Sequence, residues 1–581
     1  MHFPGRRTLT LFVAVLVAAA LTATPAALAA PGDLDATFAT GGVFTAPFMT
    51  TFPGAEDSQT IAVDSQGRVY LSATQEPSLS ATMPPRKVNV VRLSPQGVPD
   101  PGFGTGGTVT LPTTGDVRNA GIVVDAQDRP IVLTNNGENA LTWRIGLTRL
   151  TTGGTPDPSF GGGDGVVETA LPGTLWNPWP AGIALDAGGG ILVVGTLITC
   201  GPCTRHSGFV ARFDSGGAID ATYGTGGWTT IADMGTEMSA VHALPAGGAV
   251  VAGYDDYAEW VVARLTSGGA LDNTFDTDGL ARSGLGAPTQ PNVANFGVTV
   301  DTQGRPVVVG QSTSGGNGSL AVARWTSAGA PDSTFGTGTP AAGVKLLPAV
   351  GGRGIDAAVQ CTDGKLLVAT IGTPPASPVS RMSLARLNDD GTLDTSFAAA
   401  SGAPGIGFVV SGEFGSAQDL LLTTAGAYVS GVRRQNDNMV FTDYPQVARF
   451  SANEACGGTT TTPPVTPPAP PPSPAAPPKP VAAALPAFSK LVTLPSTKKC
   501  VSRRKFSIRL RVPSGSNVIE ARVNLNGKRA AVRRGTRLRS VVDLRNLPKG
   551  SFRVEVVLTL ADGRKVKDNR RYKTCAPKRK R

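Results

Sequence analysis

The sequence predicts an all-β protein, and three observations lead to that expectation. Gly and Pro supply 73 and 47 of the 581 residues, well above average shares of roughly 7 % and 5 %, which indicates many turns. Short apolar segments alternate with these turns, and no sustained 3.6-residue period of an amphipathic helix accompanies them. The same landmarks recur about every 60 residues between residues 31 and 451. A repeat of this length predicts a core built by packing one repeat against the next.

Residues 1–30 have the features of a signal peptide. Arg6 and Arg7 form a basic start, Leu11–Leu21 is an unbroken apolar run, and Ala27–Ala29 supplies small residues for cleavage. The apolar run is too short for a hydrocarbon core that needs about 20 residues. We expect cleavage near residue 31 and export of the remaining chain, with a single-pass anchor as the alternative. No later segment is apolar enough to cross a membrane.

Three landmarks each occur seven times after the signal peptide. One is an aspartate followed three residues later by an aromatic residue, as in Asp35 and Phe38; another is a turn such as Asp64–Arg68. The third is a basic–apolar pair such as Arg92 and Leu93. The seven aspartates of the first landmark are Asp35, Asp100, Asp157, Asp220, Asp272, Asp332 and Asp394.

Each repeat contains four short segments with the composition of β-strands. In the first repeat these are Gly42–Thr45, Thr60–Val63, Val69–Ala73 and Val88–Leu93. The Asp-x-x-Gly-Arg turn joins the middle two as a hairpin, because its glycine permits a positive φ. Seven units of four strands predict a seven-bladed β-propeller over residues 31–456. A linear β-solenoid is the alternative.

These motifs together resemble the bacterial delta-60 repeat. The resemblance rests on the Leu-Asp-x-Thr-Phe-Gly signature, the Asp-x-x-Gly-Arg hairpin and the Ala-Arg-Leu strand, and it covers residues 31–451. It implies a secreted, propeller-type repeat protein with no established enzymatic activity. The fourth and seventh hairpins depart from the pattern, because Leu244 and Thr423 replace the aspartate and Ala427 replaces the arginine. We expect those two repeats to differ at one rim.

The seven repeated aspartates are interpreted as structural residues. A carboxylate followed by a small residue and an aromatic suits a turn in which the carboxylate accepts backbone N–H groups. A ring of carboxylates around a cation is the alternative, and Asp272, Asp276 and Asp278 form the most acidic copy. That copy lacks the spacing of a calcium-binding EF-hand loop. We therefore expect no metal and no cofactor.

The cysteines are expected to serve structure. Cys200 and Cys203 match the C-x-x-C spacing of thioredoxin-type proteins, but no helix follows them. Outside the cytoplasm we expect them to form a local disulfide. A metal site that adds His206 is the alternative. Cys361 and Cys456 belong to different repeats, and whether they pair stays open.

A different composition begins after residue 456. Residues 457–486 form a Pro/Thr-rich linker, with 11 prolines among the 18 residues 463–480, which favours an extended polyproline II spacer. Residues 487–581 contain alternating segments such as Phe506–Val512, which predict a small β-sandwich of immunoglobulin-like type. We expect a disulfide between Cys500 and Cys575, and the end of this segment weakly resembles small basic modules of secreted bacterial proteins.

The two parts of the chain carry opposite charge. Residues 31–456 contain 22 Lys and Arg against 37 Asp and Glu, a net charge of −15, whereas residues 487–581 contain 28 against 5, a net charge of +23. A strongly basic module outside the cell suits anionic polymers. The expected contact residues are Arg503, Arg504, Lys505, Arg533, Arg534, Lys578, Arg579, Lys580 and Arg581.

We interpret the chain as a secreted or cell-surface bacterial protein without enzymatic activity. The propeller would present a recognition surface to a glycan or an unknown protein, and the basic module would hold it on anionic envelope polymers. Nucleic acid is not expected, because no recognition fold accompanies the charge. One alternative is a polysaccharide hydrolase or lyase with carboxylates in the propeller channel, and another is a structural surface protein without a ligand.

Overall fold

The computed structural model describes two compact units, divided near residue 466. In the first unit it describes residues 30–452 except 51–58, 77–84, 114, 140–141, 172–176, 200–203, 233, 235–236, 256–258, 287–296, 313–318, 337–340, 348–352, 360–362, 376, 378, 410–413 and 438–439. In the second it describes residues 492–493, 506–510, 518–526, 528–534, 541–544, 551–560 and 565–573. The predicted signal peptide, the linker and all six cysteines lie outside the described residues.

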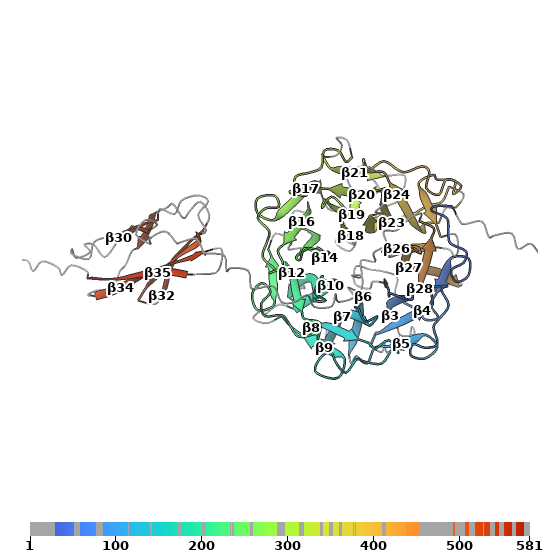
Figure 1. Ribbon diagram of the computed structural model, residues 1–581, viewed down its shortest axis with the longest axis horizontal. Helices are drawn as coiled ribbons and strands as arrows, with labels where there is room; N and C mark the ends of the chain where they lie inside the picture. The colour runs from blue at the N-terminus through green and yellow to red at the C-terminus, as the bar shows by residue number, and fades with distance from the viewer. Residues whose placement is uncertain are drawn as a thin grey trace, which may run out of the picture. The chain divides into compact units, whose positions relative to one another are not determined.

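The described strands of the first unit form seven four-stranded antiparallel sheets arranged radially around one axis (Figure 1). This is the arrangement of a β-propeller. The first three sheets, from inner to outer strand, are β2 (Thr60–Val63), β3 (Val69–Gln75), β4 (Lys87–Leu93) and β5 (Thr108–Thr110); β6 (Asp116–Val124), β7 (Pro130–Asn139), β8 (Thr142–Arg149) and β9 (Val166–Thr169); β10 (Asn177–Leu185), β11 (Ile191–Thr199), β12 (Thr204–Phe213) and β13 (Trp228–Ile231).

The next three sheets follow the same order along the chain. They are β14 (Glu237–Ala243), β15 (Ala249–Tyr254), β16 (Glu259–Leu265) and β17 (Leu280–Gly286); β18 (Gly297–Val300), β19 (Pro306–Ser312), β20 (Ser319–Arg324) and β21 (Val344–Leu347); β22 (Arg353–Val359), β23 (Leu366–Gly372), β24 (Arg381–Leu387) and β25 (Ile406–Phe408).

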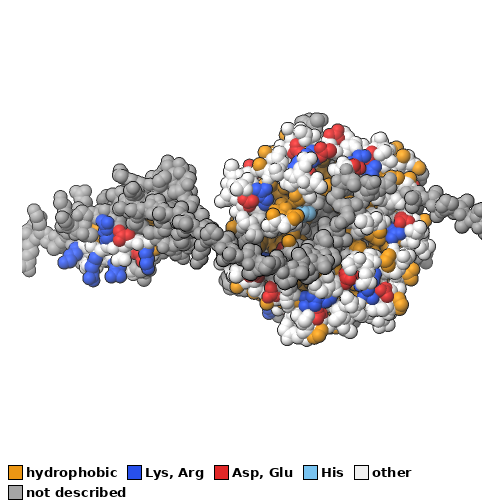
Figure 2. Space-filling view, in the orientation of Figure 1, with side chains coloured by type: hydrophobic (Ala, Val, Ile, Leu, Met, Phe, Trp, Pro, Cys, Tyr) orange, Lys and Arg blue, Asp and Glu red, His pale blue; other side chains and the backbone are white. Residues whose placement is uncertain are grey.

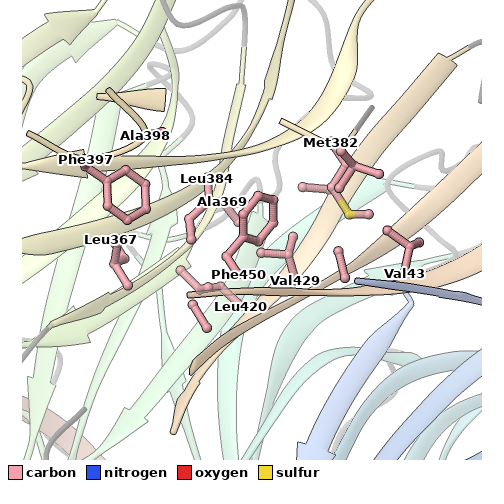
Figure 3. Close-up of a cluster of buried hydrophobic side chains, with 14 residues drawn as sticks. Val43, Leu367, Ala369, Met382, Leu384, Phe397, Ala398, Leu420, Val429 and Phe450 are labelled. Atoms are coloured by element: carbon pink, nitrogen blue, oxygen red, sulfur yellow. The ribbon is translucent and has the colours of Figure 1, made fainter. Parts of the chain in front are cut away.

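The remaining sheet joins the two ends of the repeat region. Its inner strands are β26 (Phe414–Thr423), β27 (Gly426–Asp437) and β28 (Val440–Phe450), and its outer strand is β1 (Val43–Thr45). Val43 pairs with Ala448, and its side chain lies in one buried cluster with Phe450 and Leu384 (Figure 3). The N-terminal segment therefore closes the ring.

This closure corrects one prediction. The sequence analysis groups Gly42–Thr45 with the three strands that follow it, but β1 belongs to the sheet of β26–β28. Each sheet is thus offset by one strand from the repeat read in the sequence, and its outer strand comes from the start of the next repeat. The offset has a physical reason, because pairing the first strand with the last sheet removes the exposed edges of an open arc.

Apolar side chains fill the spaces between neighbouring sheets. Ile131 and Leu133 of β7 pack against Val193 of β11 and Phe209 of β12, for example. The aromatic residue of every repeat is also buried at such an interface, at no more than 2 % exposure. The seven aromatic residues are Phe38, Phe103, Phe160, Tyr223, Phe275, Phe335 and Phe397.

The antiparallel order of the strands gives the first unit two distinct faces. We call the face with the turns between first and second strands the hairpin face; it also carries the loops with the repeated aspartates. We call the opposite face the connection face, because it carries the second-to-third-strand turns and the connections between sheets.

The described strands of the second unit form two antiparallel sheets. One contains β29 (Val492–Thr493), β30 (Phe506–Leu510) and β33 (Val541–Leu544), and the other has the order β32 (Lys528–Arg534), β31 (Val518–Leu525), β34 (Ser551–Leu560) and β35 (Lys565–Lys573). A turn at Asn526 joins β31 to β32, and Asn526 has a φ of 49°. None of the described residues of either unit forms a helix able to span a membrane.

Candidate functional site

The hairpin face carries the same ion pair in every repeat. The arginine that ends the third strand contacts the repeated aspartate, with N–O distances of 2.6–2.9 Å in six repeats; Arg212 and Asp220 form the seventh pair. Figure 2 shows basic and acidic side chains next to each other around the ring. In six repeats the guanidinium carbon lies 4.6–5.0 Å from the centroid of the buried aromatic ring.

Each repeated aspartate also holds its own turn. In Asp332, Oδ1 accepts hydrogen bonds from the backbone N–H and the hydroxyl of Thr334, at 3.0 and 2.7 Å. Burial alone would raise the pKa of Asp332, but these hydrogen bonds and the charge of Arg324 outweigh burial and hold the pKa below its ordinary value. The pKa is lowered in the same way at Asp35, Asp157, Asp220, Asp272 and Asp394.

The same motif joins neighbouring sheets. Arg264 donates from Nη1 to the carbonyl of Ser327 at 2.6 Å, and Arg449 donates to the carbonyl of Pro95 at 2.8 Å. At the point of ring closure, the N–H of Ala398 donates to the carbonyl of Pro31 at 2.7 Å. Every member of the motif therefore has a partner within the protein. Among the described residues, no group of His, Cys, Asp or Glu side chains is placed to hold a metal ion.

Among the described residues, a different cluster occurs at one place, on the connection face between β6–β9 and β10–β13. We call Arg118, Asn135, Trp143 and Trp179 the Trp–Arg cluster. The two indole rings meet edge to face with centroids 4.8 Å apart, and the Arg118 guanidinium carbon lies 5.3 Å from Trp143 and 5.6 Å from Trp179. Arg118 comes from the start of β6, Trp143 from the start of β8 and Trp179 from the start of β10.

An ionic chain extends from this cluster toward the preceding sheet. Nε of Arg118 lies 3.7 Å from Oδ2 of Asp116, and Asp116 also pairs with Arg86 at 3.2 Å. Arg86 in turn pairs with Glu76 at 2.7 Å. The chain holds two positive and two negative groups, so its charges balance.

The sequence analysis missed this cluster. Trp143 and Trp179 are 36 positions apart, and aromatic residues make up only 6 % of the chain, so composition gave no sign of an aromatic site. One local signal was present, because Gly137 stands directly opposite Trp143 in the β7–β8 pairing. A Cβ at Gly137 would lie 2.7 Å from the Trp143 ring, so glycine is what allows the indole to lie over β7.

His242 lies on β14 and has no equivalent histidine in the other repeats. It is half-buried, and burial lowers its pKa to about 4. The imidazole is therefore neutral at physiological pH. Burial is the one cause of this pKa shift. No described carboxylate therefore raises the pKa of His242 or pairs with it for acid–base chemistry.

The second unit presents a basic face. Arg522 of β31, Arg553 of β34, and Lys567, Arg571 and Lys573 of β35 are all exposed. Strand pairing sets Arg553 directly opposite Arg571, and it sets Arg522 in line with Lys567 through Val557. All five therefore lie on one face of the sheet, which we call the basic face, and its opposite face buries Ala521, Val523, Phe552, Val554, Val556, Leu558 and Tyr572.

The predicted polymer-contact residues are only partly described. Arg533 and Arg534 lie on β32, and their side chains are outside the description. Arg503, Arg504, Lys505 and Lys578–Arg581 lie outside the described residues altogether. The basic face is thus a set of cations that the sequence analysis did not single out, because the sequence alone did not say which of many cations share a face.

Comparisons with known proteins support the fold. Residues 249–275, 304–335 and 361–397 match a family described as a β-propeller domain of unknown function, DUF5122. Each matched segment ends at the buried aromatic residue of a repeat. No curated protein matches the chain. The described part of the first unit is therefore a propeller-type repeat structure.

Several solved structures are similar at low identity. The extracellular domain of a putative one-component system from B. thetaiotaomicron is 11 % identical with a TM-score of 0.33, and the match covers 92 % of this chain but 59 % of that one. An aldose sugar dehydrogenase from Streptomyces coelicolor is 14 % identical with a TM-score of 0.30, covering 70 % and 97 %. An ulvan lyase is 11 % identical with a TM-score of 0.33, covering 73 % and 98 %. Similarities this low carry no argument about activity.

Proposed function

We propose that this chain is a secreted, non-enzymatic binding protein of the bacterial cell envelope. Its first unit would be a seven-bladed propeller of delta-60 type that presents a recognition surface. Its second unit would be an immunoglobulin-like sandwich that retains the protein on anionic envelope polymers. The predicted export signal in residues 1–30 and the opposite charges of the two units support this division of roles.

The observation that carries the proposal is the basic face. Neighbouring strands lie about 4.8 Å apart and alternate residues of a strand about 6.7 Å apart. The five cations therefore lie close enough together to contact one polymer, with Glu555 among them on the same face. Like charges directly opposite each other, as in Arg553 and Arg571, destabilise a sheet. A bound polyanion would relieve that repulsion. A face of this kind suits a flexible, regularly charged polymer better than a shaped small molecule.

The test is co-sedimentation of residues 31–581 with purified cell envelopes across about 50–500 mM salt, because screening weakens such binding. In one variant Arg553, Lys567 and Arg571 become threonine, which suits an exposed strand. In the matched control Arg553→Lys, Lys567→Arg and Arg571→Lys keep the charge. We expect the threonine variant to pellet poorly and to lose part of the salt dependence, and the control to bind like the parent.

Two outcomes would contradict the proposal. If the threonine variant pellets as well as the parent at every salt concentration, the basic face is not the anchor. If the parent does not pellet at about 50 mM salt, retention on the envelope is wrong. Circular dichroism of each variant checks that the sheet is still folded.

A further inference from the structure

We propose that the Trp–Arg cluster is a binding site for an uncharged saccharide. The inference rests on the proposed recognition role of the propeller and assigns that role a face, a set of residues and a class of ligand. It concerns the connection face between β6–β9 and β10–β13.

Among the described residues, Asn135 is the one with two buried side-chain polar atoms that lack a hydrogen-bond partner. Its side chain is 2 % exposed, yet neither Oδ1 nor Nδ2 has a hydrogen-bond partner among the described residues. Buried amides are nearly always hydrogen-bonded, because leaving one unpaired destabilises the fold. Its neighbours on the same strand face, Leu133 and Ile131, are apolar and buried, so an apolar residue would fit the packing.

The equivalent residues of the neighbouring sheets show which hydrogen bond Asn135 lacks. In β3, Thr74 accepts the backbone N–H of Asn119 from the next sheet at 2.9 Å. In β11, Thr196 accepts that of Met238 at 3.1 Å. Asn119 and Met238 each stand just before the bulge of a first strand, and the equivalent residue of β10 is Pro180. Proline has no N–H to donate.

The amide therefore has both hydrogen-bonding functions available on the sheet face that carries Trp143. Pairing places Asn135 between Arg118 and Ile145 on one face of the sheet, and Ile145 belongs to the cluster packed against β10–β13. That face is also the one from which Arg118 reaches Trp143 and Trp179. The unpartnered amide and the aromatic pair thus belong to the same space between sheets.

The chemistry of these groups matches a sugar. An amide that donates and accepts can bind the hydroxyl groups of a saccharide, which also do both. Indole rings offer apolar faces with a polar edge, suited to the C–H surface of a pyranose ring. The ionic chain from Glu76 to Arg118 is balanced, so the site favours an uncharged ligand over an acidic one.

The experiment uses residues 31–581 in about 500 mM salt, where binding of polyanions to the second unit is screened. The probes are cellotetraose, maltotetraose and chitotetraose, with tetragalacturonate as the acidic comparison. Binding is followed by tryptophan fluorescence and by saturation-transfer NMR. We expect at least one neutral tetrasaccharide to bind, and its dissociation constant to rise at least tenfold in Trp179→Leu and in Asn135→Leu.

Asn135→Leu separates binding from folding. It removes a buried unpaired amide, so the midpoint of thermal unfolding should stay the same or rise while binding is lost. Trp228→Phe, on β13, is the matched control for loss of an indole and should bind like the parent. If Asn135→Leu is more stable and binds the sugar unchanged, Asn135 is a packing defect and the proposal is wrong.

The remaining outcomes are also decisive. If none of the neutral probes binds, the saccharide site is overturned, and if only tetragalacturonate binds through Trp179, the assignment of an uncharged ligand is overturned. Failure of the envelope experiment would leave this result unaffected, because the two experiments change different units and only envelope binding is expected to weaken with salt.

Discussion

The two faces of the first unit differ in what they repeat. On the hairpin face the arginine, aspartate and aromatic residue recur in all seven repeats, and each copy is paired within the protein. On the connection face the Trp–Arg cluster occurs between one pair of sheets and includes a buried amide without a partner. A group needed by every sheet is explained by architecture. Among the described residues, Asn135 is the one side chain with both a buried donor and a buried acceptor unpartnered, so it calls for another explanation.

The largest expected effect tests the repeated face. Asp157→Ala leaves Arg149, whose side chain is 3 % exposed, with the more distant carboxylate of Asp125 at 3.8 Å in place of a contact at 2.8 Å. It also removes a partner of Arg129 at 2.9 Å. Breaking such a buried pair costs about 3–5 kcal/mol. Urea unfolding should show this loss, and tetrasaccharide binding by the folded protein should not change.

A matched substitution within the same motif sharpens this result. The Arg212–Asp220 pair is more exposed, at 24 % and 17 % for the two side chains, so Asp220→Ala should cost about 1 kcal/mol. Equal losses in the two variants would mean that burial of the pair does not set its contribution.

An intermediate loss of folding stability is expected from His242 as the pH falls. Its pKa falls to about 4 in the folded state from an ordinary value near 6.5. Between these values the unfolded chain binds a proton that the folded protein does not, so stability decreases as pH falls. Because the side chain is only half-buried, we expect a loss of about 1–2 kcal/mol between pH 7 and pH 4.5.

The control is His242→Leu, which should lose this part of the pH dependence. Urea unfolding of both proteins at the two pH values provides the measurement. The lowered aspartate pKa values act at more acidic pH, as those carboxylates protonate below their ordinary range, so they do not obscure the window. Identical pH dependence in parent and variant would exclude His242 as its source.

The smallest expected effect concerns Gly137, which leaves room for the Trp143 indole of the Trp–Arg cluster. Gly137→Ala adds a Cβ 2.7 Å from the Trp143 ring, so the indole must shift. We expect a loss of about 1 kcal/mol in stability and a several-fold weaker saccharide affinity. Gly162→Ala is a control at a glycine where a Cβ meets nothing within 4 Å, although its φ of 87° adds local strain. Unchanged affinity in Gly137→Ala would show that the position of the Trp143 indole does not matter for saccharide binding.

The sequence by itself determined the repeat, because landmarks such as Asp332 and Phe335 recur about every 60 residues. Their local chemistry is the same in each copy. It also determined the strands, since alternation and turn residues act over a few positions. The predicted disulfides and all of the predicted polymer contacts remain predictions.

Only the tertiary structure decided which strands share a sheet, which cations share a face, and which distant residues meet. The sequence order of β1 gives no sign that it pairs with β28, since ring closure depends on contacts some 400 residues apart. Trp143 and Trp179 meet for the same reason, because two different sheets bring them together. Local sequence patterns reflect interactions between residues a few positions apart, whereas the packing of the sheets depends on contacts around the whole ring.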